Sequence, residues 1–311
     1  MKDKRTIACI VLIMVGLLMS LVTLVAIGFE LETLLDQRED TYEITESFNR
    51  IAMDLDTADV TIKPSTDGKC TLYTKCKDSA TIKYTVEKGE LKIVEETKIL
   101  TELFCMGSNS MILYLPKDSY NTLKIDGSTT DVNISDISFE SGEIVVSTGD
   151  VTINSNVGKL NVSVSTGDIS ITGLTGNSIT LKSTTGDVSI ENSTLSGALK
   201  LKGKTSDFEM KNVSLHSIEA EVSTGDVELE SVIVTKEMKL KTSTGDIELK
   251  GCDAEAMEIK TSSGDVEGTL LTSKIFYTES RSGKISVPKS DKGGMCQVVT
   301  SSGDIKFKIE K

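Results

Sequence analysis

The stretch that decides the fold is residues 221–250, EVSTGDVELESVIVTKEMKLKTSTGDIELK. It contains the tetrapeptide Ser-Thr-Gly-Asp twice, with the glycines at Gly225 and Gly245. Hydrophobic and polar residues alternate after each copy, as in Val227 and Leu229 after the first. Alternation at period two around a glycine turn predicts short strands that meet at a corner and bury one face.

The same corner recurs along the C-terminal part of the chain. Complete copies have the corner residues Gly149 and Asp150, Gly167 and Asp168, Gly186 and Asp187, Gly225 and Asp226, Gly245 and Asp246, Gly264 and Asp265, and Gly303 and Asp304. Weaker copies end at Asp131, Asp207 and Lys284. The mean spacing of about 19 residues is a fixed period of the kind that marks a solenoid.

Hydrophobic residues keep fixed offsets from each corner glycine. Around Gly167 they lie seven, five and three residues before it, and two, four and seven after it. The sequence therefore predicts an all-β fold, a single-stranded parallel β-helix whose rungs stack about 4.8 Å apart. A left-handed hexapeptide helix has coils of similar length, but it requires a six-residue sub-period that this sequence lacks.

The corner residues have a structural interpretation. Glycine adopts a positive φ without steric cost, and Asp, Ser or Thr can hydrogen-bond the exposed backbone of a corner. Some copies lack one of these residues: Ser206 replaces the glycine, and Lys284 replaces the aspartate. A residue that repeats can omit is expected to belong to the scaffold and not to a catalytic site.

A divergent first rung lies upstream of the regular repeats. Residues 51–62 have the same hydrophobic offsets, with Ala58 and Asp59 at the corner. An insertion follows, with strand-like segments at 71–73, 81–86, 91–94 and 111–116. We therefore expect a linker at residues 30–47, an N-terminal β region at 48–119, and the solenoid repeats at 120–311.

The uncharged segment from Ile7 to Phe29 predicts a membrane anchor at residues 1–29. As a helix it would span about 34 Å, enough to cross about 30 Å of hydrocarbon. Basic residues precede it at Lys2, Lys4 and Arg5, so the positive-inside rule predicts a cytoplasmic N-terminus and an extracytoplasmic C-terminal domain. A cleaved signal peptide is the alternative, but the segment exceeds the usual apolar region, and a small-x-small site is missing before Glu30.

Composition limits the partners of this chain. The net charge is −13, which disfavours binding to nucleic acid and adsorption to anionic lipid. Aromatic residues make up 4%, and tryptophan is absent. The core must therefore consist of Val, Ile and Leu, which pack well on pleated strands.

Five of the six cysteines follow the anchor segment. Cys70 and Cys76 belong to one predicted strand, about 20 Å apart, and cannot bond to each other. A disulfide between one of them and Cys105 stays open. Cys252 and Cys296 fall on inward positions, where cysteine commonly acts as a small hydrophobic residue.

The chain resembles a family of bacterial cell-envelope proteins with β-strand repeats, the putative-adhesin family, a domain of unknown function. The resemblance rests on Leu113-Tyr114-Leu115-Pro116, on Leu123-Lys124-Ile125 and on the serial Ser-Thr-Gly-Asp corners. It covers the chain from about Phe48 to the C-terminus. It implies a right-handed parallel β-helix, a surface role and an N-terminal anchor helix, and it implies no established activity.

Sequence motifs for catalysis are missing. β-Helix enzymes that act on polysaccharides use paired carboxylates near a groove, or a calcium-activated base with a cationic partner. The repeats contain one histidine, His216, and one arginine, Arg281, and no set of nucleophile, base and orienting residue stands out. We expect no catalytic residue and no cofactor; the alternative is a carbohydrate-active β-helix enzyme acting on wall or extracellular polysaccharide.

Acidic residues at equivalent outward positions form one candidate metal site. Stacking would bring like carboxylates within about 5 Å, and such repulsion is destabilising. Lys241 and Lys260 are expected to offset it, or else Ca²⁺ binds there, although the acidic nine-residue calcium repeat is absent. The candidate residues are Asp226, Glu228, Asp246, Glu248, Asp265 and Glu267.

Taken together, the sequence predicts a membrane-anchored extracytoplasmic solenoid with a non-enzymatic role, as an adhesin, a scaffold or an envelope-stress accessory protein. Its partner is expected to be a protein or the cell wall, bound along the side face of the solenoid. The last strand, from Ile305 to Ile309, is expected to form an open edge. Lys306, Lys308 and Lys311 should discourage edge pairing there, so we expect a monomer.

Overall fold

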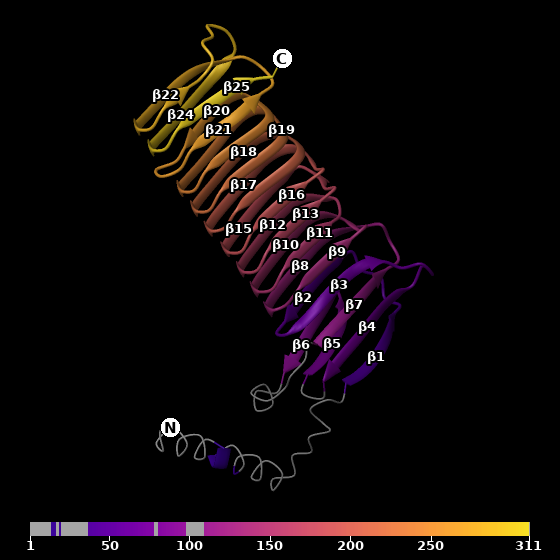
Figure 1. The fold of residues 1–311 in the computed structure, drawn as a ribbon. Coiled ribbons are helices and arrows are strands. Elements are labelled where there is room, and N and C mark those ends of the chain that lie inside the picture. The colour runs from indigo at the N-terminus through magenta and orange to yellow at the C-terminus, as the bar shows by residue number, and fades with distance from the viewer. Residues whose placement is uncertain (1–13, 17–18, 20–36, 78–79, 98–108, 311) are drawn as a thin grey trace.

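The chain folds into a rod of stacked β-strands (Figure 1). The computed structural model describes residues 14–16, 19, 37–77, 80–97 and 109–310. Over the described residues, 25 strands form one continuous sheet that winds along the rod. The predicted all-β solenoid is therefore confirmed.

Long and short strands alternate in the repeats. The first long strands are β8 (Ser119–Thr129), β10 (Ser138–Thr148), β12 (Val157–Thr166) and β15 (Ser178–Thr185). The short strands after them are β9 (Val132–Ser135), β11 (Val151–Asn154), β13 (Ile169–Thr172) and β16 (Val188–Glu191), and β14 (Thr175–Gly176) lies in one return segment.

In the next repeats neighbouring segments merge. The return segment first joins the following long strand, and from the second of these strands on the short strand joins as well. This gives β17 (Thr194–Thr205), β18 (Phe208–Thr224), β19 (Val227–Thr244) and β20 (Ile247–Lys260). The C-terminal strands are β21 (Val266–Leu270), β22 (Lys274–Ser282), β23 (Ile285–Ser286), β24 (Gly294–Ser302) and β25 (Ile305–Ile309).

Equivalent residues of successive rungs pair in parallel, so each inward position forms a column in the core. Ile144 pairs with Val162, and Val162 pairs with Leu181. All three side chains are almost fully buried. A one-residue shift would turn every inward side chain toward solvent, so this hydrophobic pattern fixes the register.

The corner glycines are required by the neighbouring rung. In the complete copies their φ values lie between +123° and +155°, a region that L-residues with side chains rarely adopt. A Cβ on Gly225 would also lie 2.1 Å from the backbone oxygen of Ser206 in the preceding rung. Both the conformation and the close approach of the rungs exclude a side chain.

In two repeats that lack the corner glycine, a glycine lies three residues earlier. Thr130 and Ser206 replace it and are buried. A Cβ on Gly127 would lie 2.9 Å from the Thr130 Cβ, and a Cβ on Gly203 would lie 3.1 Å from the Ser206 Cβ. In these two rungs the corner residue has a side chain, and the glycine three residues earlier leaves the space for it.

A ladder of hydrogen bonds connects the corners, and we call it the corner ladder. Each corner aspartate accepts, on Oδ1, the backbone N–H of the corner residue in the next rung. These bonds measure 2.7–3.1 Å and link, in order, Asp59, Asp131, Asp150, Asp168, Asp187, Asp207, Asp226, Asp246, Asp265, Asp304 and Lys284. Lys284 ends the ladder and has no following amide to accept, which explains why this copy lacks an aspartate.

The last two rungs are stacked in the reverse of their sequence order. β24 lies between β20 and β22, and β25 lies between β21 and β23. The expectation that β25 forms the open edge is therefore wrong, because the chain returns after β23 and inserts its last segment into the stack. The end rung is β22 with β23 (Figure 1).

The N-terminal rungs show the same interchange. β2 (Arg50–Leu55) lies between β6 (Glu90–Thr97) and β8, and β3 (Ala58–Pro64) lies between β7 (Asn109–Leu115) and β9. The rung that comes first in the sequence is thus second in the stack. The predicted insertion supplies the rung outside it.

Antiparallel strands then cover this end of the rod. β5 (Ala80–Glu87) pairs with β6, β4 (Cys70–Lys77) pairs with β7, and β1 (Gln37–Ile44) pairs with β4. The expectation of a linker through residue 47 is therefore wrong for β1. Its inward side chains are apolar, and the rings of Tyr42 and Tyr84 pack edge to face at 5.6 Å.

Glu95 takes the place of a corner aspartate at the first corner. Its buried carboxylate accepts the backbone N–H groups of Asp56, Thr57 and Ala58 at 2.8, 2.8 and 2.9 Å. It also accepts a hydrogen bond of 2.8 Å from the Asn109 side-chain amide. A corner without a preceding aspartate is thereby satisfied by a charged acceptor.

The predicted anchor from Ile7 to Phe29 lies almost entirely outside the described residues. Among the residues that are described, none belongs to a helix long and apolar enough to cross a membrane.

Replacing Gly225 by alanine should destabilise the rod strongly. The new Cβ would combine an unfavourable φ with a collision against the neighbouring rung, so we expect a loss of at least about 3 kcal/mol in the free energy of unfolding. Gly68→Ala is the matched control, since Gly68 has φ +73° and a Cβ there would meet open space. It should cost about 1 kcal/mol. Urea unfolding of both variants measures the difference, and equal losses would contradict the steric role of the corner.

Candidate interaction face

The corner ladder occupies the most frequently repeated polar residues of the chain. Each aspartate in it has one oxygen engaged with the next rung, so these residues serve the scaffold. The outward side chains of the strands remain available to a partner. We call the outward residues of the long strands the long-strand face and those of the short strands the short-strand face.

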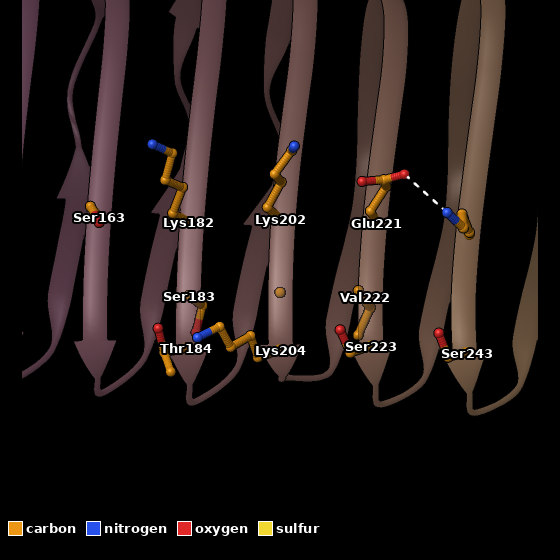
Figure 2. Close-up of a pocket in the computed structure, with 12 residues that line it drawn as sticks. Ser163, Lys182, Ser183, Thr184, Lys202, Lys204, Glu221, Val222, Ser223 and Ser243 are labelled. Atoms are coloured by element: carbon orange, nitrogen blue, oxygen red, sulfur yellow. Dashed lines mark hydrogen bonds and ion pairs between the residues drawn. The ribbon is translucent and has the colours of Figure 1, made fainter.

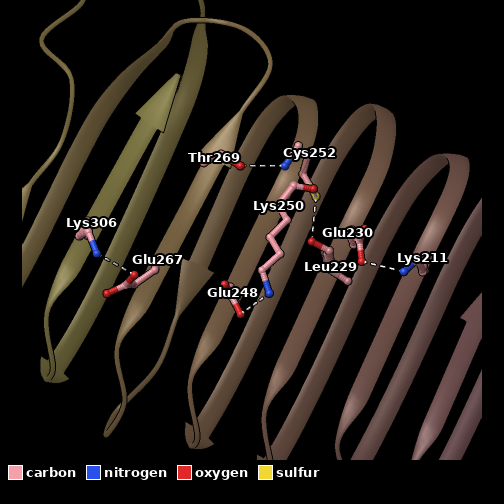
Figure 3. Close-up of polar contacts among 10 residues, drawn as sticks. Lys211, Leu229, Glu230, Glu248, Lys250, Cys252, Glu267, Thr269 and Lys306 are labelled. Atoms are coloured by element: carbon pink, nitrogen blue, oxygen red, sulfur yellow. Dashed lines mark hydrogen bonds and ion pairs between the residues drawn. The ribbon is translucent and has the colours of Figure 1, made fainter. Parts of the chain in front are cut away.

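The short-strand face has a column of glutamates. Glu209, Glu228, Glu248 and Glu267 are in register across four rungs. Two of them form ion pairs, Glu248 with Lys250 at 2.8 Å and Glu267 with Lys306 at 3.0 Å (Figure 3). All four of these side chains are exposed, so each pair contributes at most about 1 kcal/mol.

The lysines expected to offset this column lie on the other face. Lys241 pairs with Glu221, and Lys260 pairs with Glu258, all on the long-strand face. That expectation was wrong because both lysines precede the corner, where the chain turns onto a new face. The lysines that do pair with glutamates of this column, Lys250 and Lys306, each follow a corner.

The proposed calcium site gains no further ligands. Asp226, Asp246 and Asp265 each accept an amide N–H through Oδ1. Within residues 37–77, 80–97 and 109–310, no three His, Cys, Asp or Glu side chains are arranged to hold a metal ion. Calcium binding at this column stays a prediction.

Charges alternate in sign along most of the long-strand face. Ion pairs between neighbouring rungs join Lys124 to Glu143 at 3.8 Å, Lys200 to Glu219 at 3.6 Å, and Lys241 to Glu221 at 3.4 Å. The face therefore carries little net charge over these rungs.

Lysines break the alternation at two places. At the first, Lys241 lies opposite Lys260. These two lysines have ion-pair partners in Glu221 and Glu258.

The other break lies where β15 and β17 meet. Lys182 lies directly opposite Lys202, and Lys204 follows two residues later on the same face. In the described part of the chain, none of these three lysines has an ion-pair partner. They line a shallow hollow of about 400 Å³, which we call the lysine hollow (Figure 2).

Hydroxyl groups surround these lysines. The side chains of Ser163, Thr184, Ser223 and Ser243 line the lysine hollow. The sequence contained only part of the signal, since Lys182 and Lys202 lie four residues before a corner position. Lys241 and Lys260 have the same spacing but are ion-paired. The hollow was missed because ion pairing between rungs depends on the register and on side-chain direction.

The two residues weighed for catalysis lie apart from each other. His216 is exposed on β18, and its Nδ1 lies 3.3 Å from the Thr235 hydroxyl oxygen. Arg281 is exposed on the end rung. Neither arrangement resembles a base with its orienting carboxylate.

The described cysteines are buried thiols. Cys252 and Cys296 are fully buried, as predicted for small core residues, and Cys70 and Cys76 are free and buried on β4. Burial raises the pKa of Cys252 to about 11 and that of Cys296 to about 12. Thiolates are the reactive form, so these groups are unreactive at neutral pH. Cys105 lies outside the described residues, so its disulfide stays open.

A family model described as Toastrack DUF4097 matches residues 48–232 and 198–311, which together include every rung of the stack. Among proteins with curated functions, none matches this chain.

Three similar solved structures come from Bacteroides and Parabacteroides species. A putative adhesin from Parabacteroides merdae is 13% identical, with 75% of this chain and 96% of that chain covered and a TM-score of 0.48. A putative adhesin from Bacteroides fragilis is 16% identical, with 88% and 97% covered and a TM-score of 0.42. A putative lipid binding protein from Parabacteroides distasonis is 16% identical, with 87% and 97% covered and a TM-score of 0.43.

Calcium should leave the thermal stability of the purified protein unchanged. The corner aspartates already accept hydrogen bonds from backbone amides, and Glu248 and Glu267 are paired with lysines. We therefore expect the same Tm in millimolar Ca²⁺ and in a chelator. A rise in Tm with Ca²⁺ but not with Mg²⁺ would show instead that the glutamate column binds calcium.

Proposed function

Because the chain belongs to the Toastrack DUF4097 family, we propose that it is a membrane-anchored extracytoplasmic solenoid with a non-enzymatic role at the cell surface. It acts as an adhesin, a scaffold or an envelope-stress accessory protein. Its partner is a protein or the cell wall, bound along the side of the rod.

The observation that carries this proposal is that the polar residues have two separate roles, one at the corners and one on the outward faces of the strands. The corner ladder uses the repeated aspartates to hold successive rungs together, so selection for the fold explains them. The outward residues of the long strands vary from rung to rung, from Ser163 to Lys182 and Glu221 at equivalent positions. A side face whose chemistry varies over a regular backbone suits recognition of an extended partner.

The anchor follows from the segment between Ile7 and Phe29. It is long enough to cross a bilayer, and basic residues precede it. The first strand, β1, begins at Gln37, shortly after this segment. The antiparallel strands that cover the N-terminal end would then lie toward the membrane, and the end rung would point away from it.

We also propose a monomer, now because of charged residues on β22 and not because of the lysines near β25. The strand at the open end is β22 and not β25. Its outward residues include Glu279 and Arg281, and Lys284 follows it. Charged side chains on an edge strand oppose pairing with a second chain.

A carbohydrate-active enzyme is the alternative function. Glycan-processing sites bring two carboxylates together near the scissile bond. The stacked carboxylates of the glutamate column lie on the outward face of the short strands, and two of them, Glu248 and Glu267, pair with lysines. Turnover of wall glycans by the purified protein would favour the enzyme over the surface solenoid.

Labelling of engineered thiols on intact cells should place the end rung outside. With Cys9 and Cys105 replaced by serine, Lys289→Cys in the exposed loop after β23 should react with a membrane-impermeant maleimide. The matched control, Lys2→Cys, should react only after the cells are permeabilised. The opposite pattern, or protection of both sites until lysis, would exclude the proposed topology.

A further inference from the structure

The lysine hollow holds three lysines without an ion-pair partner among the described residues, whereas Lys124, Lys200 and Lys241 on the same face are paired. Lys182 and Lys202 are directly opposite each other on strands about 4.8 Å apart. Like charges in that position destabilise a strand pair. The hollow thus has a cost in the free protein, which a bound anion would remove.

One carboxylate, that of Glu221, also lines the hollow, and it is paired with Lys241 of the same lining. Glu221 lies opposite Lys202 but pairs with Lys241 in the next rung, at 3.4 Å (Figure 2). Glu219 pairs with Lys200 at 3.6 Å. The three lysine ammonium groups of the hollow are therefore free to meet an anion from outside.

The lining favours phosphate over carboxylate. Lysine ammoniums act as point charges that suit phosphate, whereas the arginine fork that binds carboxylate in a bidentate way is missing from the lining. Hydroxyls of Thr184 and Ser223 can donate to the same oxygens. A phosphodiester has two non-bridging oxygens and can accept from an ammonium group and a hydroxyl together.

The arrangement also indicates a linear ligand. Lys182 and Lys202 follow each other along the axis of the rod, so a chain with repeated charges would cross the strands. None of the residues that line the hollow is aromatic, so nucleobases would find no surface on which to stack. The net charge of −13 limits the contact to a short segment, because screening confines attraction to about 8 Å at physiological salt.

We propose that the lysine hollow binds phosphodiester groups of a linear anionic polymer at the cell surface, through Lys182, Lys202 and Lys204. This deepens the proposed function and rests on it only for the place where the ligand is met. Binding requires no covalent step and no cofactor.

Binding of fluorescent poly(glycerol phosphate) to the full chain in neutral detergent tests the proposal. Replacing Lys182, Lys202 and Lys204 by glutamine should lower the affinity at least tenfold. The matched control replaces Lys211, Lys250 and Lys306, which lose the same charge from the short-strand face, and should change affinity less than twofold. The slope of log K against log salt concentration should become shallower by about 2 units or more in the hollow variant only.

The melting temperature separates a binding role from a structural one. The hollow variant should melt at or above the temperature of the unmodified protein, because it loses a repulsion. The control should melt at or below it, because it loses three ion pairs.

Three results would overturn the proposal. They are absence of binding by the unmodified chain at low salt, equal losses in both triple variants, and equal binding of polyglutamate of matched length and charge. Failure of the surface labelling described above would remove the cellular location while leaving a measured binding site in place. The two proposals can therefore fail separately.

Discussion

The hydrogen bond from each corner amide to the aspartate of the preceding rung sets the geometry on which the other features depend. To bring the amide N–H of Asp226 within 2.8 Å of Asp207, the two rungs must approach closely at the corner. That approach leaves no room for a side chain at Gly225. The corner therefore favours glycine beside aspartate, and Thr130 and Ser206 replace it only where a glycine lies three residues earlier. The hydrophobic positions keep a fixed distance from the corner.

The ends of the rod show how a ladder of this kind begins and stops. At the first corner the buried Glu95 supplies the carboxylate, and antiparallel strands cover the rung outside it. At the other end Lys284 receives the last bond and passes none on. In both places the chain places an out-of-order rung at the end, so the outermost rung is tied to the stack by segments on both sides of it in the sequence.

Sequence reasoning predicted the features that depend on one rung alone. The period, the inward positions, the corner glycines and the strands of the insertion all follow from local hydrophobicity and turn chemistry. The order of the rungs does not, because a period gives the length of a rung and not its neighbours. One signal of the order was present. The last copy in the sequence keeps its corner aspartate, Asp304, whereas the copy before it has Lys284, as expected if the Lys284 copy lies at the end of the stack.

The candidate site illustrates the same limit. Lys182 and Lys202 fall at outward positions of the alternating pattern, but their lack of acidic partners depends on which rungs touch. Lys241 and Lys260 were assigned to the wrong face because both precede the corner, where the chain turns onto a new face. The strand β1 was taken as linker because its outward half is charged and only Tyr42 and Ile44 face the core.

Amide hydrogen exchange followed by mass spectrometry tests most directly whether the rungs are stacked out of order. β25 has a paired strand on each side, whereas β23 has one. Protection against exchange follows such differences in local stability. We expect Ile305–Ile309 to be protected about as well as Val266–Leu270, and Ile285–Ser286 to exchange earlier. Early exchange of Ile305–Ile309 with protection of Ile285–Ser286 would show that the rungs follow sequence order and would contradict this account.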